Sequence, residues 1–362
     1  MRVTRGDTNL VLLARRWLVR QVDRVQALMA PRTFLRGFAG FQLLVAGFRL
    51  GLFELLATSP ELTAEQIRDR LRIPDHAVRA LLLACASIGL VKRNPRRGTY
   101  RNARSIERMF AGPGREWAIP HLEAFHFLMY QPFFMLTEAL RQGANVGLQC
   151  LPGTGRTLYD RLESNPENRR IFYAWMKSIK HGSVPAEVVA ALHGCRRVLD
   201  IGGGDGDNAM DLVRRVPGLN VTIIDLADTC ALAARNAAAA GLSERIGVSP
   251  GNFLDDPLPQ GADAIVFAHI FNIYSEETNQ ALVEKCADAL PKGGKLIVYN
   301  LISDDDQAGP WNAGFMSLYF QVLATGTGSV YPPSRYETWF ANANFASLTI
   351  HTLGEGIFIG TK

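Results

Sequence analysis

The chain has 362 residues, of which 48% are hydrophobic and 20% are charged, and its formal net charge is +5. This length is enough for two domains, and the composition is ordinary for a globular protein with a large core. The five cysteines have no CxxC or CxxxC spacing, which argues against a disulfide framework or a zinc site. The most apolar long window, residues 37–57, contains Gln42, Arg49 and Glu54 and is therefore no membrane span. No signal peptide is visible, so we expect a soluble cytoplasmic protein without a membrane partner.

The first part of the chain is rich in arginine and has a helical pattern. Apolar residues recur at helical spacing over residues 8–29 and stop before Pro31, and a second apolar helix is expected from about Phe38 to Ala57. Both are apolar enough to predict packing against another subunit. The arginines favour a solvated helix face, with attraction to nucleic acid or acidic lipid as the alternative.

A compact pattern of short helices and a hairpin follows. Thr63-Ala-Glu-Gln66 is a capping box that begins a helix ending at Leu71, and Asp75 is expected as the N-cap of a helix ending near Ile88. Residues 90–92 and 99–101 predict a hairpin, which makes the segment a winged helix-turn-helix. The candidate recognition helix offers only His76 and Arg79 to base edges, so we expect no nucleic-acid partner.

The remainder predicts a helical, aromatic segment and then an α/β domain. Residues 113–185 are helical and contain many aromatic side chains, some of which are expected to line a pocket for a flat organic substrate. From about Ala186, helices alternate with strands, which predicts a doubly wound parallel sheet of the Rossmann-like class. The expected strands are 198–201, 221–225, 246–250, 264–267 and 294–300, followed by an edge hairpin of 347–352 and 356–361.

The most informative motif is the glycine run that follows the first of these strands. Residues 199–206 read LDIGGGDG, and Asp225 ends the next strand, where an acid is able to accept both hydroxyls of a ribose. Asp205 and Asp207 lie where a dinucleotide would place its pyrophosphate, which they would repel. A positively charged nucleoside with an amino-acid tail, S-adenosylmethionine, fits this pattern better.

Further motifs extend the pattern beyond the glycine run. They are Ile224-Asp225-Leu226 at the end of the second strand, Gly251-Asn-Phe253 after the third, LPKGGK at 290–295, and Asn344-Phe345 before the last hairpin. With them, residues 35–362 resemble the class I S-adenosylmethionine-dependent small-molecule O-methyltransferases of plants and microbes, including those of antibiotic pathways. The resemblance implies a homodimer formed through residues 1–112, a helical extension with a winged-helix dimerisation domain. It also implies that residues 113–362 form a helical cap and the Rossmann-like, S-adenosylmethionine-binding domain.

The same resemblance implies roles for individual residues. The glycines are expected to flank the methionine part of the cofactor, Asp225 to hold the ribose, and Asn252 and Phe253 to meet the adenine, where the family usually has an acid at position 252. The expected cofactor-binding set is Asp200, Gly202, Gly204, Gly206, Asp225, Leu226, Asn252, Phe253 and His269.

The chain departs from the family where its O-methylating members have a histidine general base. Residues 267–277 read FAHIFNIYSEE, and alignment on the trailing acids puts Asn272 at the position of the base, with His269 three residues earlier. The two acids that usually accompany the histidine correspond to Asn300 and to the stretch around Ser329. An amide takes up no proton at neutral pH. The rate enhancement of about 10²–10⁴-fold that a general base contributes is therefore missing or supplied elsewhere.

Three interpretations remain open. The first is methyl transfer, to oxygen or carbon of a small aromatic, polyketide-derived or amino-acid-derived intermediate, in which Asn272 orients an electron-rich nucleophile. The second is a non-methylating step, such as a pericyclic reaction, decarboxylation or hydroxylation, that uses the cofactor's charge. The third is a non-enzymatic regulatory or DNA-binding role.

The remaining candidates concern substrate and metal. Asn272 and His269 are the candidate catalytic residues, and the candidate substrate contacts are Asn272, Asn300, Met316, Tyr319 and Met176, with Trp175 and Phe134 as weaker ones. The acidic cluster Ser303-Asp-Asp-Asp306 is expected to be a solvated loop with a helix N-cap role, with recognition of a basic substrate group as the alternative. His121 and His126 are five residues apart on a predicted helix and therefore on different faces, so no metal site is expected.

Overall fold

The structure is a computed structural model that describes residues 1–5, 30–179, 183–352 and 355–362. The helix predicted over residues 8–29 lies outside the described residues. The described chain divides into two compact units. We call residues 30–128 with 174–179 the winged-helix unit, and residues 1–5, 129–173, 183–352 and 355–362 the sheet unit. The domain boundary expected at residue 112 stays a prediction.

The winged-helix unit has the predicted order of elements. A three-stranded sheet with strand order β2-β4-β3 accompanies its helices. The elements are α2 (Ala30–Arg49), α3 (Leu52–Thr58), β2 (Leu62–Thr63), α4 (Ala64–Leu71), α5 (Asp75–Ser87), β3 (Val91–Asn94), β4 (Thr99–Asn102), α6 (Arg104–Ile106), a π-helical turn at Glu107–Ala111, α7 (Arg115–Ala124) and a second such turn at Phe125–Met129.

One predicted helix of this unit is broken in two. The apolar pattern over 38–57 predicted one helix, but α2 ends at Arg49 and α3 starts at Leu52. Gly51 stands between them with φ 76°, a left-handed conformation that glycine adopts without a steric cost. After this break, Phe53 is 1% exposed and its ring lies 5.7 Å from that of Phe110.

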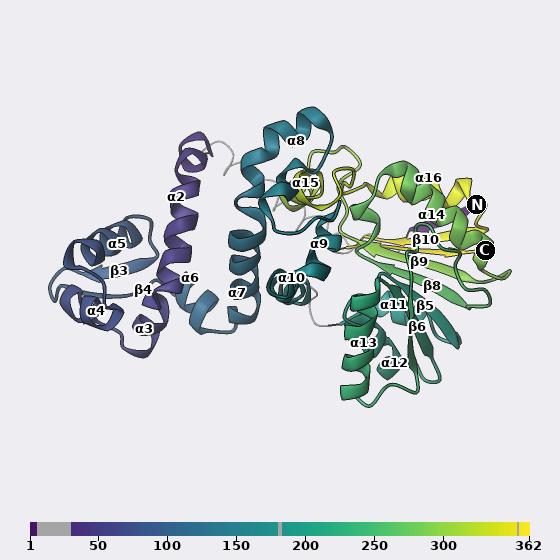
Figure 1. The fold of residues 1–362 in the computed structure, drawn as a ribbon, viewed down its shortest axis with the longest axis horizontal. Coiled ribbons are helices and arrows are strands. Elements are labelled where there is room, and N and C mark those ends of the chain that lie inside the picture. The colour runs from purple at the N-terminus through teal and green to yellow at the C-terminus, as the bar shows by residue number, and fades with distance from the viewer. Residues whose placement is uncertain (6–29, 180–182, 353–354) are drawn as a thin grey trace. The chain divides into compact units, whose positions relative to one another are not determined.

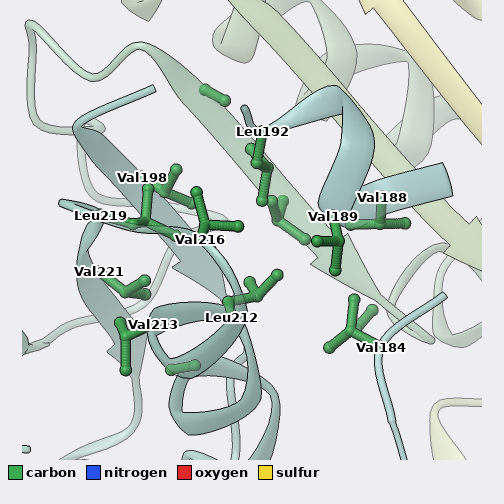
Figure 2. Close-up of a cluster of buried hydrophobic side chains, with 14 of the residues drawn as sticks. Val184, Val188, Val189, Leu192, Val198, Leu212, Val213, Val216, Leu219 and Val221 are labelled. Carbon is green, nitrogen blue, oxygen red and sulfur yellow. The ribbon is translucent and has the colours of Figure 1, made fainter. Parts of the chain in front are cut away.

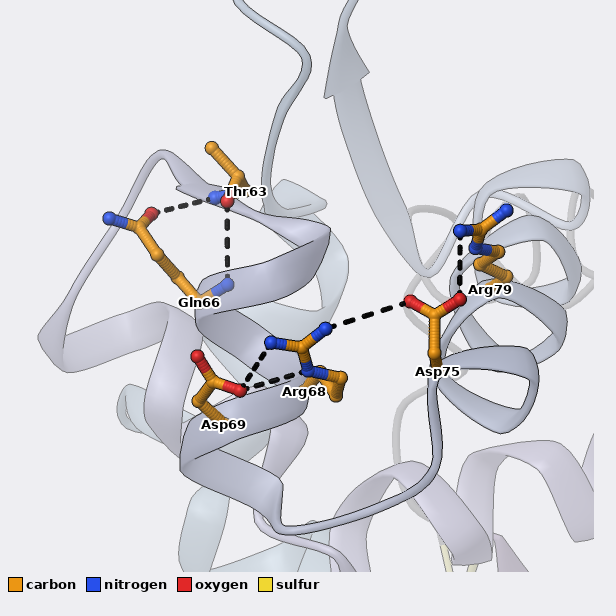
Figure 3. Close-up of polar contacts among 6 residues, drawn as sticks. All are labelled: Thr63, Gln66, Arg68, Asp69, Asp75 and Arg79. Carbon is orange, nitrogen blue, oxygen red and sulfur yellow. Dashed lines mark hydrogen bonds and ion pairs between the residues drawn. The ribbon is translucent and has the colours of Figure 1, made fainter.

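The polar contacts around α4 confirm one cap and correct another (Figure 3). The backbone N–H of Gln66 donates to Thr63 Oγ1, and the backbone N–H of Thr63 donates to Gln66 Oε1 at 2.9 Å, which completes the predicted capping box. Asp75 is not an N-cap, because Pro74 precedes α5 and Asp75 is the first helical residue. Its carboxylate instead pairs with Arg79, one turn later, at 2.8 Å.

The sheet unit is built on an eight-stranded sheet with the order β1-β10-β11-β9-β8-β5-β6-β7 (Figure 1). All neighbouring pairs are parallel except those made by β11, which is antiparallel to both of its neighbours. The strands are β1 (Arg2–Arg5), β5 (Arg197–Ile201), β6 (Asn220–Asp225), β7 (Ile246–Pro250), β8 (Ala264–Ala268), β9 (Lys295–Asn300), β10 (Ser347–His351) and β11 (Gly356–Thr361). The predicted hairpin of β10 and β11 is present, but it is not the edge, because β1 pairs with the outer side of β10.

Alternating side chains of the central strands face two layers of helices. On one face, residues such as Val198, Val266 and Ile297 pack against α11 (Ala186–Ala191), α12 (Asp207–Arg215) and α13 (Ala227–Ala239). Figure 2 shows part of this cluster, which contains valine and leucine side chains of α11 and α12 together with Val198 of β5 and Val221 of β6. The helices α14 (Glu276–Ala289) and α16 (Pro333–Asn342) contact the strands of the sheet. Phe267, Val298 and Phe358, whose side chains alternate with those of the first cluster and so point to the other face, are fully buried. Burial on both faces explains why these strands are continuously apolar.

The remaining elements are helices and turns that precede β5 or follow β8 and β9 in the chain. They are 3₁₀ turns at Pro132–Met135, Val146–Cys150 and Phe271–Ile273, the helices α8 (Leu136–Gln142), α9 (Leu158–Ser164), α10 (Pro166–Ile179) and α15 (Trp311–Tyr319), and a π-helical turn at Phe320–Ala324. Within the described ranges, no single helix has the length and apolar composition of a membrane span, and only Phe34–Arg49 and Leu52–Thr58, bent by 55°, pass that test together.

The capping box gives a prediction about the stability of the winged-helix unit. Thr63→Ala removes the side-chain acceptor for the Gln66 N–H, and we expect a loss of about 1 kcal/mol in the free energy of unfolding. The control is Thr58→Ala, because the exposed Thr58 hydroxyl donates to carbonyls of its own helix and caps no backbone N–H among the described residues. Urea unfolding of both variants measures the difference, and equal losses would contradict the assignment.

Candidate functional site

The candidate site lies at the carboxyl ends of the central parallel strands. The chain runs from β5 to β6 and β7 on one side, and then crosses to β8 and β9 on the other. The ends of β5 and β8 therefore flank the point where the strand order reverses, which is where doubly wound sheets bind ligands. The predicted residues after β5, β6, β7, β8 and β9 all belong to this edge.

The turn after β5 needs glycine at three alternate positions. Gly202, Gly204 and Gly206 have φ values of 68°, 62° and 85°, a region that other residues rarely adopt. A Cβ on Gly202 would overlap the side chain of Ile270, and a Cβ on Gly203 would lie 2.7 Å from Oδ2 of the fully buried Asp200. The backbone of this turn is thus held where only glycine fits, ahead of the first turn of α12.

Asp225 fastens this turn to the end of the neighbouring strand. Its Oδ2 accepts the Gly204 N–H at 2.9 Å, and its Oδ1 accepts the Leu226 N–H at 2.7 Å. Burial raises the pKa of the Asp225 carboxyl, while the two N–H donors oppose that shift by stabilising the ionised form. Each carboxylate oxygen keeps acceptor capacity beyond its one backbone bond.

An aromatic and an aliphatic side chain adjoin the glycine turn and were not predicted as site residues. The ring of Tyr173 would be 3.6 Å from a Cβ on Gly204, and its hydroxyl lies 3.3 Å from that of the buried Thr229. Burial raises the pKa of Tyr173 to about 12, so its phenol is neutral. Ile270 follows β8 and packs beside Gly202. Tyr173 appeared in the sequence only as one of many aromatic residues, without spacing that distinguishes it.

The turn after β7 holds the two residues expected at the adenine. Phe253 is 9% exposed, and its ring lies edge-on to those of Phe267 and Tyr274 at 6.2 and 6.1 Å. Asn252 is exposed, but its side chain bonds within its own turn. Its Nδ2 donates to Asp255 at 2.6 Å, and its Oδ1 accepts the Leu254 N–H at 3.1 Å.

His269 directly follows β8 in a left-handed backbone conformation, with φ 60°. Its backbone N–H donates to the carbonyl of Tyr299, and its ring lies 5.5 Å from the Tyr299 ring at 78°. Its Nε2 is 3.5 Å from Glu355 Oε1, in the connection between β10 and β11. A protonated His269 would therefore form an ion pair with the Glu355 carboxylate.

The two predicted amides are buried and linked through a tyrosine that was not predicted. Asn272 is 3% exposed and Asn300 is 0% exposed. The hydroxyl of Tyr336, in α16, donates to Asn272 Oδ1 at 3.4 Å and accepts from Asn300 Nδ2 at 3.1 Å. The Nδ2 of Asn272 also donates to the carbonyl of Leu301 at 2.9 Å. Asn272, which the sequence predicts at the position of the family's base, thus belongs to a neutral hydrogen-bonded group.

The remaining substrate candidates differ in their exposure. Met316 is partly exposed on α15, whereas Tyr319 is 2% exposed, and its ring lies 5.1 Å from that of Phe320. Met176 is part of the winged-helix unit. Ser329, the third member of the expected constellation, bonds to the Ser317 hydroxyl at 3.4 Å. Among the described residues, no group of three His, Cys, Asp or Glu side chains is placed to hold a metal ion.

Two family models match the chain. The O-methyltransferase domain matches residues 133–346, and the O-methyltransferase dimerisation domain matches residues 33–108. The L-tyrosine C(3)-methyltransferase of Streptomyces lavendulae is 34% identical over 335 residues, which are 91% of each chain. The 3-hydroxy-5-methyl-1-naphthoate 3-O-methyltransferase of Streptomyces sahachiroi is 32% identical over 83% of this chain and 85% of its own.

A solved structure agrees with these relatives. The apo crystal structure of the S-adenosylmethionine-dependent methyltransferase SibL superposes with a TM-score of 0.72 at 33% identity, over 92% of this chain and 98% of its own.

The residues at the carboxyl edge fit S-adenosylmethionine. The left-handed glycines let the backbone of the turn lie close against side chains such as Ile270 and Ile223, where a Cβ would not fit, and Asp225 at the end of β6 points two oriented carboxylate oxygens toward this turn and the following residue. Asp205 and Asp207 flank the turn with negative charge, which suits a sulfonium cation and disfavours a diphosphate. With this fit, the family models and the relatives, the chain belongs to the O-methyltransferase family and is an S-adenosylmethionine-dependent methyltransferase.

Proposed function

We propose that the enzyme methylates a small phenolic natural-product intermediate at a ring carbon, without a general base at position 272. The observation that carries the proposal is the neutral, hydrogen-bonded Asn272–Tyr336–Asn300 group, since Asn272 is the residue predicted at the position of the family's histidine. The 34% identity to an enzyme named for methylation of C3 of L-tyrosine supports an aromatic ring carbon as the acceptor.

The proposed cofactor contacts follow from the geometry of the β5 and β6 ends. S-adenosylmethionine supplies an electrophilic methyl group on a positively charged sulfur. Gly202, Gly204 and Gly206 flank its methionine part, and Asp225 accepts hydrogen bonds from its ribose hydroxyls. The neighbouring residues Asp200, Leu226, Asn252, Phe253 and His269 complete the proposed binding surface.

Positioning rather than proton removal is the proposed contribution of the β8 and β9 ends. Asn272 and Asn300 orient the phenolic substrate, with Met316 and Tyr319 as further contacts, and the role of Met176, in the winged-helix unit, stays a prediction. Two π electrons of the ionised phenol ring form the new carbon–carbon bond, the electron pair of the carbon–sulfur bond stays on sulfur, and the ring proton passes to water. Alignment of the reacting atoms supplies roughly 7–11 kcal/mol in well-oriented reactions, which is enough to replace a base term of about 10²–10⁴-fold.

We also propose that the protein acts in the cytoplasm as a homodimer formed through its dimerisation domain, and that it needs no nucleic acid or membrane. The match to the dimerisation-domain model supports the dimer. The large apolar side chains of α2 that remain exposed, Phe34, Leu35 and Phe38, are 67%, 76% and 67% exposed in the single chain and suit such an interface.

The role of Asp225 gives a prediction about cofactor binding. Asp225→Asn removes the charge and one acceptor oxygen, and we expect the Kd for S-adenosylmethionine to rise roughly 10- to 100-fold, since bonds to charged groups are worth about 1.5–3 kcal/mol. The matched control is Asp228→Asn, whose carboxylate is exposed and pairs only loosely with Arg169 at 3.6 Å. Isothermal titration measures both, and an unchanged Kd for Asp225→Asn would refute the ribose contact.

Cofactor binding is also expected to depend on pH. Because burial raises the pKa of Asp225, the carboxyl takes up its proton at a higher pH than an exposed aspartate does. The ionised form accepts the ribose bonds, so affinity is present above the raised pKa and falls as the pH drops through it. Titrations from pH 8 down to about pH 4, the ordinary range of an aspartate, test this, and the acid-side loss should disappear in Asp225→Asn. An equal loss in that variant would assign the effect to another group.

The reaction itself is tested by product analysis. The enzyme is incubated with S-adenosylmethionine and a panel of phenols that includes L-tyrosine, and S-adenosylhomocysteine and the methylated product are quantified by mass spectrometry. Equal amounts of both, with the new methyl group on a ring carbon by NMR, are expected. A methoxy product would move the acceptor to oxygen, and substrate conversion without S-adenosylhomocysteine would replace methyl transfer by a non-methylating reaction.

A further inference from the structure

We propose that Tyr336 is a positioning residue of the methyl transfer, because its buried hydroxyl fixes the amide of Asn272 in the one orientation that meets the substrate. The inference rests on the proposed function, in which Asn272 contacts the phenol. No short-range pattern in the sequence connects Tyr336 with Asn272, which is 64 residues away in the chain.

The hydrogen-bond inventory leaves this group one consistent arrangement. A phenol has a single hydrogen, and here it goes to Asn272 Oδ1, so Asn300 must face the Tyr336 oxygen with its Nδ2. Asn272 is held from its other end, because its Nδ2 donates to the carbonyl of Leu301. Turning the Asn272 amide over would place its oxygen against the Leu301 carbonyl and its nitrogen against the Tyr336 hydrogen.

The bonds that remain define what Asn272 offers to a substrate. An asparagine side chain has two N–H donors and two acceptor positions, and the group uses one of each. With respect to the residues that the structure describes, Asn272 thus keeps one N–H, suited to a phenolate oxygen, and one lone pair. Asn300 Oδ1 is buried and has no hydrogen-bond partner among the described residues, which costs free energy. The arrangement therefore defines the orientation of the Asn272 amide at a cost in folding free energy at Asn300.

The Tyr336 ring is fixed tightly enough to serve this purpose. It is 0% exposed and stacks on Phe358 at 3.8 Å and 6°, with Trp339 edge-on at 4.9 Å. Burial also raises the pKa of the Tyr336 phenol, so the hydroxyl keeps its proton throughout the working range of pH. The hydroxyl therefore acts as a permanent donor to Asn272.

The turn that carries Asn272 is pinned in addition to its side chain. Asn279 Nδ2 donates to the carbonyl of Phe271 at 2.7 Å, and the Tyr331 hydroxyl donates to the carbonyl of Tyr274 at 2.7 Å. These two bonds hold the backbone on both sides of Asn272. The remaining motion is rotation of the Asn272 side-chain amide, and the hydrogen bond from Tyr336 restricts it. A contact fixed in this way supplies orientation without a reorganisation step during the reaction.

The test is a double-mutant cycle with Tyr336→Phe, which keeps the stacked ring and deletes the hydroxyl, and Asn272→Ala. If Tyr336 acts through Asn272, Tyr336→Phe lowers kcat on the order of 10-fold in the native enzyme and less than about 2-fold in the Asn272→Ala background. The Kd for S-adenosylmethionine stays within about 2-fold, which separates positioning from collapse of the cofactor half. Equal effects in both backgrounds would overturn the proposal.

The control variant is Tyr331→Phe, which deletes another phenol that bonds the same turn but does not touch the Asn272 amide. Its effect on kcat is expected to be the same in both backgrounds. Coupling of Tyr331 to Asn272 as strong as that of Tyr336 would reduce Tyr336 to one of several structural supports and would overturn its special role.

A readout without turnover separates this inference from the proposed function. The side-chain NH₂ signal of Asn272, assigned by its absence in Asn272→Ala, is followed by NMR in the presence of S-adenosylmethionine. Faster solvent exchange of this signal by about 10-fold or more in Tyr336→Phe supports the fixation even if no phenol is methylated, in which case only the proposed function fails. Unchanged exchange overturns the fixation whatever the reaction.

Discussion

The Asp225 carboxylate joins the ends of two neighbouring strands, and the cofactor half of the site depends on these two bonds. One oxygen holds the Gly204 N–H in the turn after β5, and the other holds the Leu226 N–H before α13. Without these acceptors, two backbone donors at a half-buried edge would lose their partners. Because the same carboxylate is proposed to bind the ribose, the group that shapes the binding turn is also the group that recognises the ligand.

The half of the site around Asn272 and Asn300 is neutral, whereas the cofactor half depends on the carboxylate of Asp225. Asn272 and Asn300 are almost completely buried, and a charged histidine–carboxylate pair at that depth would carry a desolvation penalty of several kcal/mol per ion. Two amides and a phenol fill the same positions with hydrogen bonds and no charge. The arrangement keeps the same protonation state across the physiological pH range, and it transfers the requirement for ionisation to the substrate.

Short-range patterns predicted the parts of the structure that short stretches of chain determine. The capping box at Thr63, the glycine turn and the acid that ends β6 each depend on a few consecutive residues. The continuous helix over 38–57 was wrong because a glycine inside a helical pattern costs only about 1 kcal/mol, so periodicity alone does not reveal the break at Gly51. The pairing of β1 with β10 and the contact of Tyr336 with Asn272 join distant parts of the chain, and no local pattern encodes them.

The neutral group also bears on the choice between oxygen and carbon as the methyl acceptor. An N–H that donates to a phenolate oxygen withdraws electron density from that oxygen and occupies one of its lone pairs. The ring carbon beside it keeps its π density and is free to face the methyl group. A histidine base instead generates the oxygen nucleophile at the point where it reacts. Under the proposed function, the exchange of a base for an amide fixed by Tyr336 therefore favours carbon, in line with the tyrosine C-methylating relative.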